Sequence, residues 1–170
     1  MKSLQQHITE WKANSNTVSS IKTQYFIYKL NKRGAIKFFD EHWSEAKRYA
    51  NNIYMENHEK VPVFDNGWSC KEYNEGTYKI YIKDIDYVHD CCAMFYECNQ
   101  LISVPLFNTK NITSMTGMFS SCKNLEDVPL LDTYAVEYMT NMFYKCLNLN
   151  TETLQRWGKI YDFITHNKIL

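Results

Sequence analysis

Residues that could do chemistry gather at one place in the chain, His89-Asp90-Cys91-Cys92, with Cys98 a few positions later. Imidazole, carboxylate and thiolate groups are all metal ligands, so the residue types would suit a zinc site. Their spacing, however, matches none of the recurring zinc-binding patterns. The alternative is that Cys91 and Cys98 are core residues, because a free cysteine is a small and readily buried apolar side chain. We expect no metal here.

Catalytic motifs are absent from the sequence as well. It contains no glycine-rich phosphate loop, no Gly-x-Ser-x-Gly, no His-Glu-x-x-His and no Cys-x-x-Cys. His42 falls near the start of an expected helix, where a histidine on the solvated face is the simpler interpretation than a general base. The sequence therefore predicts a protein that is not an enzyme and that needs no cofactor.

The elements that would position these residues follow an internal repeat of 24 residues. The repeated columns are Met94, Met118 and Met142; Phe95, Phe119 and Phe143; Cys98, Cys122 and Cys146; and Leu101, Leu125 and Leu149. One copy is too short to bury its own apolar side chains, so equivalent residues must pack in columns through a shared core. We expect Leu101, Val104 and Leu106 to point inward from a short strand, and Ile80 to start a degenerate first copy.

The phrase Met-Phe-x-x-Cys-x-x-Leu-x-x-Val-Pro-Leu-x-x-Thr, present at 94–109 and again at 118–133, resembles the BspA-like leucine-rich repeats of bacterial surface proteins and some bacteriophage proteins. The resemblance implies a right-handed solenoid that binds protein or glycan surfaces, with no catalytic residue to carry over. The expected fold class is α+β: a short, capped, leucine-rich-repeat-like solenoid of about three repeats with a parallel sheet, preceded by a small α+β N-terminal module.

Three parts of the chain are expected on this basis. They are an α+β N-terminal capping module over 1–76, the leucine-rich-repeat solenoid over 77–150 and a C-terminal capping helix over 151–170. The elements expected within the first part are a helix over 2–13, a hairpin of 24–30 with 35–39, a helix that follows Asp40 as N-cap and ends before Asn57, and a strand over 68–73 that forms a hairpin with 77–83.

Composition excludes two classes of partner. Lys+Arg and Asp+Glu number 19 each, so the net charge is zero and no basic tract could neutralise the phosphates of a nucleic acid. No window approaches the roughly 18 apolar residues of a membrane span, so no membrane insertion is expected. Residues 1–12 lack the apolar core of a secretory signal. We expect a cytoplasmic protein with cysteines as thiols, or else a virion protein.

The predicted binding site lies on the outward face of the repeat strands, where side chains alternate with the inward ones. The candidate partner-binding residues are Lys79, Tyr81, Lys83, Phe107, Asp127 and Leu131. If Tyr81, Phe107 and Leu131 line up, they form an exposed apolar strip of the kind that marks a binding site. The alternative is that the N-terminal module or a loop lies over them. The sequence does not choose between the two.

The function that fits these expectations is a non-enzymatic protein-protein interaction module, for instance a phage- or bacterium-encoded inhibitor of a host system. Its partner would be another protein of unknown identity. One alternative is a structural or decoration component of a virion or cell surface. Another is an enzyme in the N-terminal module, with the repeats used for targeting; such an enzyme would need a cleft with convergent polar groups.

Overall fold

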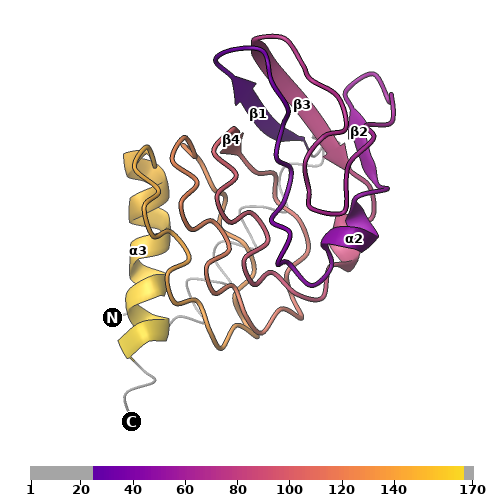
Figure 1. Ribbon diagram of the computed structural model, residues 1–170. Helices are drawn as coiled ribbons and strands as arrows, with labels where there is room; N and C mark the ends of the chain where they lie inside the picture. The colour runs from indigo at the N-terminus through magenta and orange to yellow at the C-terminus, as the bar shows by residue number, and fades with distance from the viewer. Residues whose placement is uncertain (1–24, 167–170) are drawn as a thin grey trace.

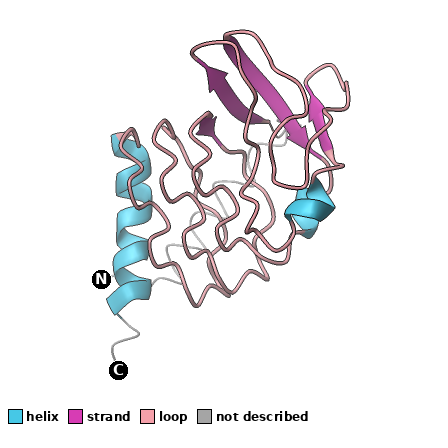
Figure 2. Ribbon diagram, in the orientation of Figure 1, coloured by secondary structure: helices cyan, strands magenta, loops and turns pink. Residues whose placement is uncertain are grey.

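The structure is a computed structural model that describes residues 25–166, with side chains up to residue 158. The helix predicted over 2–13 lies outside this range. The elements in chain order are β1 (Phe26–Leu30), α2 (Ala46–Tyr49), β2 (Ile53–Met55), β3 (Gly76–Ile82), the 3-10 helix η1 (Ile85–Tyr87), β4 (Leu101–Ser103) and α3 (Thr151–His166) (Figures 1 and 2). Within the described range, no helix combines the length and the apolar character needed to span a bilayer.

The strands form one sheet in the order β2-β3-β1-β4, and every neighbouring pair is antiparallel. The predicted fold class is therefore wrong: the sheet of the described residues is not parallel, and the expected leucine-rich-repeat-like solenoid is not formed. The reason is that β1 pairs with both β3 and β4, with Phe26 opposite Ile80. It occupies the place beside β4 that a first parallel repeat strand would need.

Both predicted hairpins are also wrong. Residues 35–39 do not pair with β1; single bridges join Gly34 to Tyr73 and Lys37 to Trp68 instead. Residues 68–73 do not pair with β3 either, because β3 finds its partners in β1 and β2. Sequence proximity favoured the hairpins, but Ile36, Phe38 and Phe39 are all fully buried, whereas the residues of a half-exposed hairpin strand would alternate between buried and exposed.

The helix predicted after Asp40 is much shorter than expected, because only the four residues of α2 are helical. Ile53 and Tyr54, which were expected on its apolar stripe, lie in β2 opposite Ile82 and Tyr81. Their β-branched and aromatic side chains suit a strand, and pairing with β3 overrides the helical periodicity. Asp40 does not cap α2: its carboxylate accepts a hydrogen bond from the amide of His42 in a turn. The helix predicted near the C-terminus is confirmed as α3.

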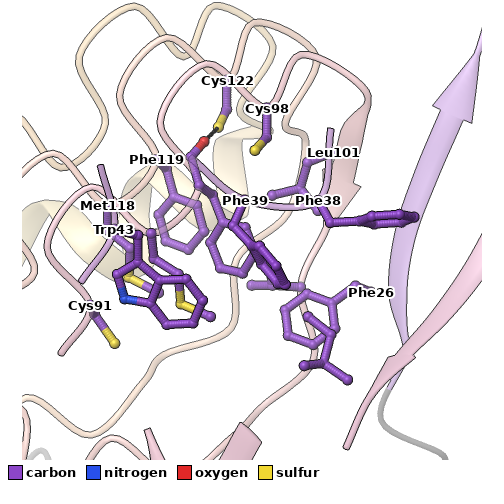
Figure 3. Packing of buried hydrophobic residues seen from close by; sticks show 14 of the residues in the cluster. Phe26, Phe38, Phe39, Trp43, Cys91, Cys98, Leu101, Met118, Phe119 and Cys122 are labelled. Atoms are coloured by element: carbon purple, nitrogen blue, oxygen red, sulfur yellow. Dashed lines mark hydrogen bonds between the residues drawn. The ribbon is translucent and has the colours of Figure 1, made fainter. Parts of the chain in front are cut away.

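Between the sheet and α3, the repeats lie against one another through turns (Figure 1). We call residues 91–98, 115–122 and 139–146 the first, second and third turns. The rings of Phe95, Phe119 and Phe143 stack with centroids 5.5 and 5.6 Å apart and nearly parallel planes. The thiol of Cys122 donates a hydrogen bond to the carbonyl of Phe95 at 2.8 Å (Figure 3). The predicted packing of equivalent residues in columns is confirmed.

Buried side chains of the repeat recur at every third residue after β4, not at every second. Leu101, Val104 and Phe107 are buried, whereas Leu106, which was expected inward, is 41% exposed. The expectation of strict alternation was wrong because β4 ends at Ser103, so no sheet imposes a period of two beyond it. Pro105 also lacks the amide that would continue a ladder.

Two positions in each turn have a left-handed backbone. The φ angles are 55°, 62° and 59° at Ala93, Gly117 and Asn141, and 58°, 62° and 58° at Glu97, Ser121 and Lys145. Five of these six residues are not glycine, although a side chain disfavours this conformation. The recurrence at intervals of 24 residues shows that the three turns share one backbone shape.

This shape gives a test of stability. Gly117→Ala should lower the free energy of unfolding by about 1 kcal/mol, because glycine adopts a positive φ readily whereas the Cβ of alanine disfavours it. The new Cβ would meet only the Cβ of Ser120, at 4.0 Å, so no clash contributes. Ala93→Gly should change the stability in the opposite direction. Denaturant titration measures both.

Gly34→Ala is the matched control, since Gly34 lacks a left-handed φ and a Cβ there would touch nothing within 4 Å. Equal losses in Gly34→Ala and Gly117→Ala would show that the turn conformation is not what makes the second variant unstable.

Candidate functional site

The candidate residues on the N-terminal side lie on and after β3. The ammonium of Lys79 pairs with the carboxylate of Glu56 at 2.8 Å, and both side chains are about half exposed. Tyr81 is half-buried and lies opposite Tyr54 in the sheet. Lys83 is exposed, and its backbone amide donates to the carbonyl of Asn52 at 2.8 Å. Their role in partner binding stays a prediction.

The candidate residues of the repeats are placed differently. Phe107 and Leu131 are only 3% and 2% exposed, and the ring of Phe26 lies 6.1 Å from that of Phe107. Phe107 is therefore covered by the N-terminal part of the chain, which is the second of the two alternatives that the sequence left open. Asp127 accepts hydrogen bonds from Thr153 and Arg156, so it holds α3 in place. The six candidates do not meet on one exposed face.

The cluster at 89–92 serves to join two parts of the chain. The backbone amides of His89 and Asp90 donate to the carboxylate of Glu45 at 2.7 and 2.8 Å, and the Asp90 carboxylate accepts from the amide of Cys92 at 2.8 Å. Cys91 is fully buried. Among the side chains that the structure describes, within residues 25–158, no three metal-ligating groups lie close enough together to hold an ion.

Thiol chemistry is suppressed in the same region. Burial raises the pKa of the Cys91, Cys98 and Cys122 thiols, and it raises the pKa of Cys146 to about 11. The thiolate is the reactive form of cysteine, so these four side chains remain unreactive thiols near neutral pH. Of the six cysteines, only Cys70 is exposed.

An ion pair that the sequence analysis missed connects the N-terminal part to the first turn. The Lys37 ammonium lies 2.7 Å from the Asp40 carboxylate and donates to the carbonyl of Tyr96 at 3.0 Å. The two charged side chains are only 9% and 5% exposed. The signal in the sequence was a lysine between the apolar residues Ile36 and Phe38, because a charge in a buried run needs a partner.

Both members of the pair are charged. Burial lowers the pKa of Lys37, but the hydrogen bond to Asp40 and nearby negative charge outweigh it, so the net shift is upward. Burial raises the pKa of Asp40, but hydrogen bonds from Lys37 and His42 outweigh it, so the net shift is downward. The pair is thus a buried internal contact in which both partners keep their charge.

The strongest candidate for a binding site is at the other end of the repeats. A pocket of about 330 Å³ opens between the third turn and α3; its lining is Asn141, Phe143, Tyr144, Leu149, Thr153, Leu154, Trp157 and Gly158. Most of this lining is apolar. Tyr144 and Leu154 are 54% and 56% exposed at its mouth, and Leu147 beside it in the chain is 75% exposed.

Residues 63–164 match the family described as Mycoplasma protein of unknown function, DUF285. The chain belongs to this family. DUF285 is related to BspA-type repeat proteins, which confirms the coarser part of the resemblance seen in the sequence. The DUF285 region contains β3, the three turns and most of α3, whereas β1 and the Lys37–Asp40 pair precede it. Neither a protein with curated annotation nor a solved structure matches the chain.

Thiol labelling tests the burial of the cysteine column. At about pH 8, a thiol-specific reagent such as Ellman's should react quickly with one cysteine of the native protein, Cys70, because only that thiol is exposed. Unfolding in guanidinium should release all six. Cys70→Ser should abolish the fast phase and serves as the control. A fast reaction at Cys98 or Cys122 would mean that the column opens in solution.

Replacement of Lys37 tests the ion pair. Lys37→Met should lower the free energy of unfolding by about 3–5 kcal/mol, because it leaves the buried Asp40 carboxylate without its counter-charge. Lys71→Met is the matched control: the Lys71–Glu59 pair has a similar distance, 2.9 Å, but both side chains are about half exposed, so little change is expected. Denaturant titration distinguishes the two.

A pH titration adds a second readout for the same variant. The folded-state pKa of Asp40 is depressed, so its contribution to stability is present above the unfolded value of about 3.9 and is lost as the pH falls through the folded value. Lys37→Met should weaken the dependence of the free energy of unfolding on pH in this acid range. Equal stability losses in Lys37→Met and Lys71→Met, with unchanged pH dependence, would contradict the account.

Proposed function

We propose that this protein is a non-enzymatic module that binds another protein through an apolar surface at the C-terminal end of its repeats. We call this the terminal surface; it consists of the exposed side chains Tyr134, Tyr138, Tyr144, Leu147 and Leu154. Exposed apolar side chains that cluster in one region mark interaction sites, because leaving them in water is unfavourable. Two of these side chains, Tyr144 and Leu154, line the pocket between the third turn and α3.

Comparison of the copies supports the proposal. At three outward positions the earlier copies carry polar residues and the last copy an apolar one: Asp86 and Lys110 become Tyr134, Asp90 and Ser114 become Tyr138, and Asn99 and Lys123 become Leu147. Core packing does not require these changes, since all three side chains are more than half exposed. The last copy thus differs from the others where it could contact a partner.

The resemblance to BspA-like leucine-rich repeats supports the same class of function, because it implies binding to protein or glycan surfaces. The chemistry of the described residues adds to this. Cys91, Cys98 and Cys122 are buried and Cys146 is half-buried, all four with raised pKa values, and the buried lysine is neutralised by Asp40, so neither group offers a nucleophile. All six cysteines are free, which favours a reducing compartment such as the cytoplasm. An inhibitor of a host system would be one form of this function.

A second candidate is a component of a cell surface or virion, and the relation of the family to BspA-type proteins is the observation that favours it. Fractionation separates the two candidates. Recovery in the soluble fraction with a single partner supports the interaction module, whereas recovery with the envelope or with particles supports the surface component.

Affinity capture tests the proposed surface. Tagged full-length protein should retain one partner from a lysate of its source organism, and Tyr144→Glu combined with Leu147→Glu should weaken that capture about tenfold or more, because charges then face an apolar contact. Tyr87→Glu is the control, since Tyr87 is 66% exposed but lies in η1, outside the terminal surface. Equal capture by both variants, or equal loss, would reject the surface.

A further inference from the structure

The turns are joined by a regular ladder of backbone hydrogen bonds. The amide of every second residue in one turn donates to a carbonyl 23 positions later, at 2.7–3.0 Å. The donor and acceptor residues are Ala93 and Thr116, Phe95 and Met118, Glu97 and Ser120, Met115 and Tyr138, Gly117 and Thr140, Phe119 and Met142, and Ser121 and Tyr144. Each turn therefore has a carbonyl edge that faces the preceding turn and an amide edge that faces the next one.

The carbonyl edge of the first turn is closed by the N-terminal part of the chain. The Trp43 indole donates to the carbonyl of Asp90 at 2.7 Å, and the Asp40 amide donates to the carbonyl of Met94 at 3.0 Å. The Lys37 ammonium donates to the carbonyl of Tyr96 at 3.0 Å. These three donors take the place of the amides that a preceding turn would supply.

The described residues do not close the amide edge of the third turn in this way. The amides of Asn141, Phe143 and Lys145 are equivalent to those of Gly117, Phe119 and Ser121. They have no backbone acceptor within residues 25–166 and no acceptor among the side chains described up to residue 158. The turn keeps the backbone shape of the others, with φ angles of 59° at Asn141 and 58° at Lys145. Its donors are therefore oriented as in the earlier turns, and an open edge of this kind can recruit another chain.

The pocket runs along this open edge. Asn141, Phe143 and Tyr144 form one wall, and Leu154 and Trp157 of α3 form the other. Trp157 packs edge-on against Phe143, with ring centroids 5.5 Å apart. Trp157 therefore covers the last ring of the phenylalanine stack, next to the amides that lack acceptors. A row of donors next to an apolar pocket is the arrangement by which proteins bind extended peptides: backbone bonds give affinity and the pocket selects a side chain.

We infer that the third turn binds a short extended peptide segment of another protein. The backbone carbonyls of the peptide accept hydrogen bonds from the amides of Asn141, Phe143 and Lys145, and one apolar side chain of the peptide enters the pocket beside Leu154. This inference rests on the proposed function and names its binding element. The first turn of a second copy cannot supply these acceptors, because Trp43, Asp40 and Lys37 of that copy already donate to its carbonyl edge.

Hydrogen exchange of the free protein tests the premise. The amides of Asn141, Phe143 and Lys145 should exchange rapidly, whereas those of Gly117, Phe119 and Ser121 should be protected, because only the latter have an acceptor in the part of the chain that the structure describes. Equal protection of the two sets would show that the third turn has no free donors and would overturn the inference.

A displayed library of random 12-residue peptides, selected on the full-length protein, tests binding. Selected peptides should shift the amide resonances of Asn141, Phe143 and Lys145, and they should bind Leu154→Glu about tenfold or more weakly, since a charge then enters the apolar pocket. Tyr87→Glu should bind them as the wild type does. Thermal melts of both variants establish that they are folded.

Three outcomes would overturn the inference. The first is that no peptide is enriched, or that the enriched peptides bind Leu154→Glu normally. The second is that the same resonances shift with protein concentration alone, which would make a second copy the occupant. The third is that they shift equally with acetate or phosphate, which would make the edge an anion site. A partner captured through Tyr144 and Leu147 would survive any of these, so the proposed function can stand when the peptide site fails.

Discussion

The backbone ladder between turns is the constraint on which the rest of the structure depends. Amides donate 23 positions forward, and this spacing forces equivalent side chains of the 24-residue repeat to lie over one another. The Phe95, Phe119 and Phe143 rings can stack nearly parallel only because the ladder holds their backbones in register. The left-handed residues bend each turn so that its donors face one way. Unfavourable φ angles at residues such as Ala93 are tolerated because the ladder offsets them.

Because all amides of the ladder point the same way, the ladder itself leaves carbonyls free at one end and amides free at the other, and different groups lie against each end. At the carbonyl end, a lysine ammonium, a backbone amide and an indole N–H supply donors to the first turn. Burying Lys37 for this purpose requires a counter-charge, which Asp40 provides at 2.7 Å. Buried backbone carbonyls need hydrogen-bond donors. The ion pair and the loop that carries it contact the repeats in a way that provides these donors.

The sequence predicted the columns but not the sheet, and the physical reason is the range of the interactions. Repetition at a fixed interval constrains Cys98 and Cys122 directly, because stacked copies must superimpose their equivalent residues. The partners of β1 depend instead on contacts between segments about 50 to 75 residues apart, such as Phe26 with Ile80 and Tyr28 with Leu101, which no local pattern encodes. The exposed apolar strip predicted from Tyr81, Phe107 and Leu131 is wrong at Phe107 for a related reason: the prediction assumed that side chains alternate beyond the end of β4. The terminal surface could have been found by asking where copies differ in outward residues, as Lys123 and Leu147 do.

The C-terminal helix explains why the two sides of the last repeat differ. Around Val128, α3 satisfies the backbone. Arg156 and Trp157 donate to the carbonyl of Val128 at 2.8 and 3.1 Å, and the hydroxyl of Thr153 accepts from the amide of Val128 at 3.3 Å. A helix can offer side chains in this way, but its own carbonyls are engaged in its internal hydrogen bonds. It therefore cannot supply the row of backbone acceptors that the amides of the third turn require. An α-helix is a suitable cap for carbonyls and for apolar surface, and an unsuitable one for an amide edge. The kind of element that ends the repeat therefore explains why the described residues leave this edge without acceptors.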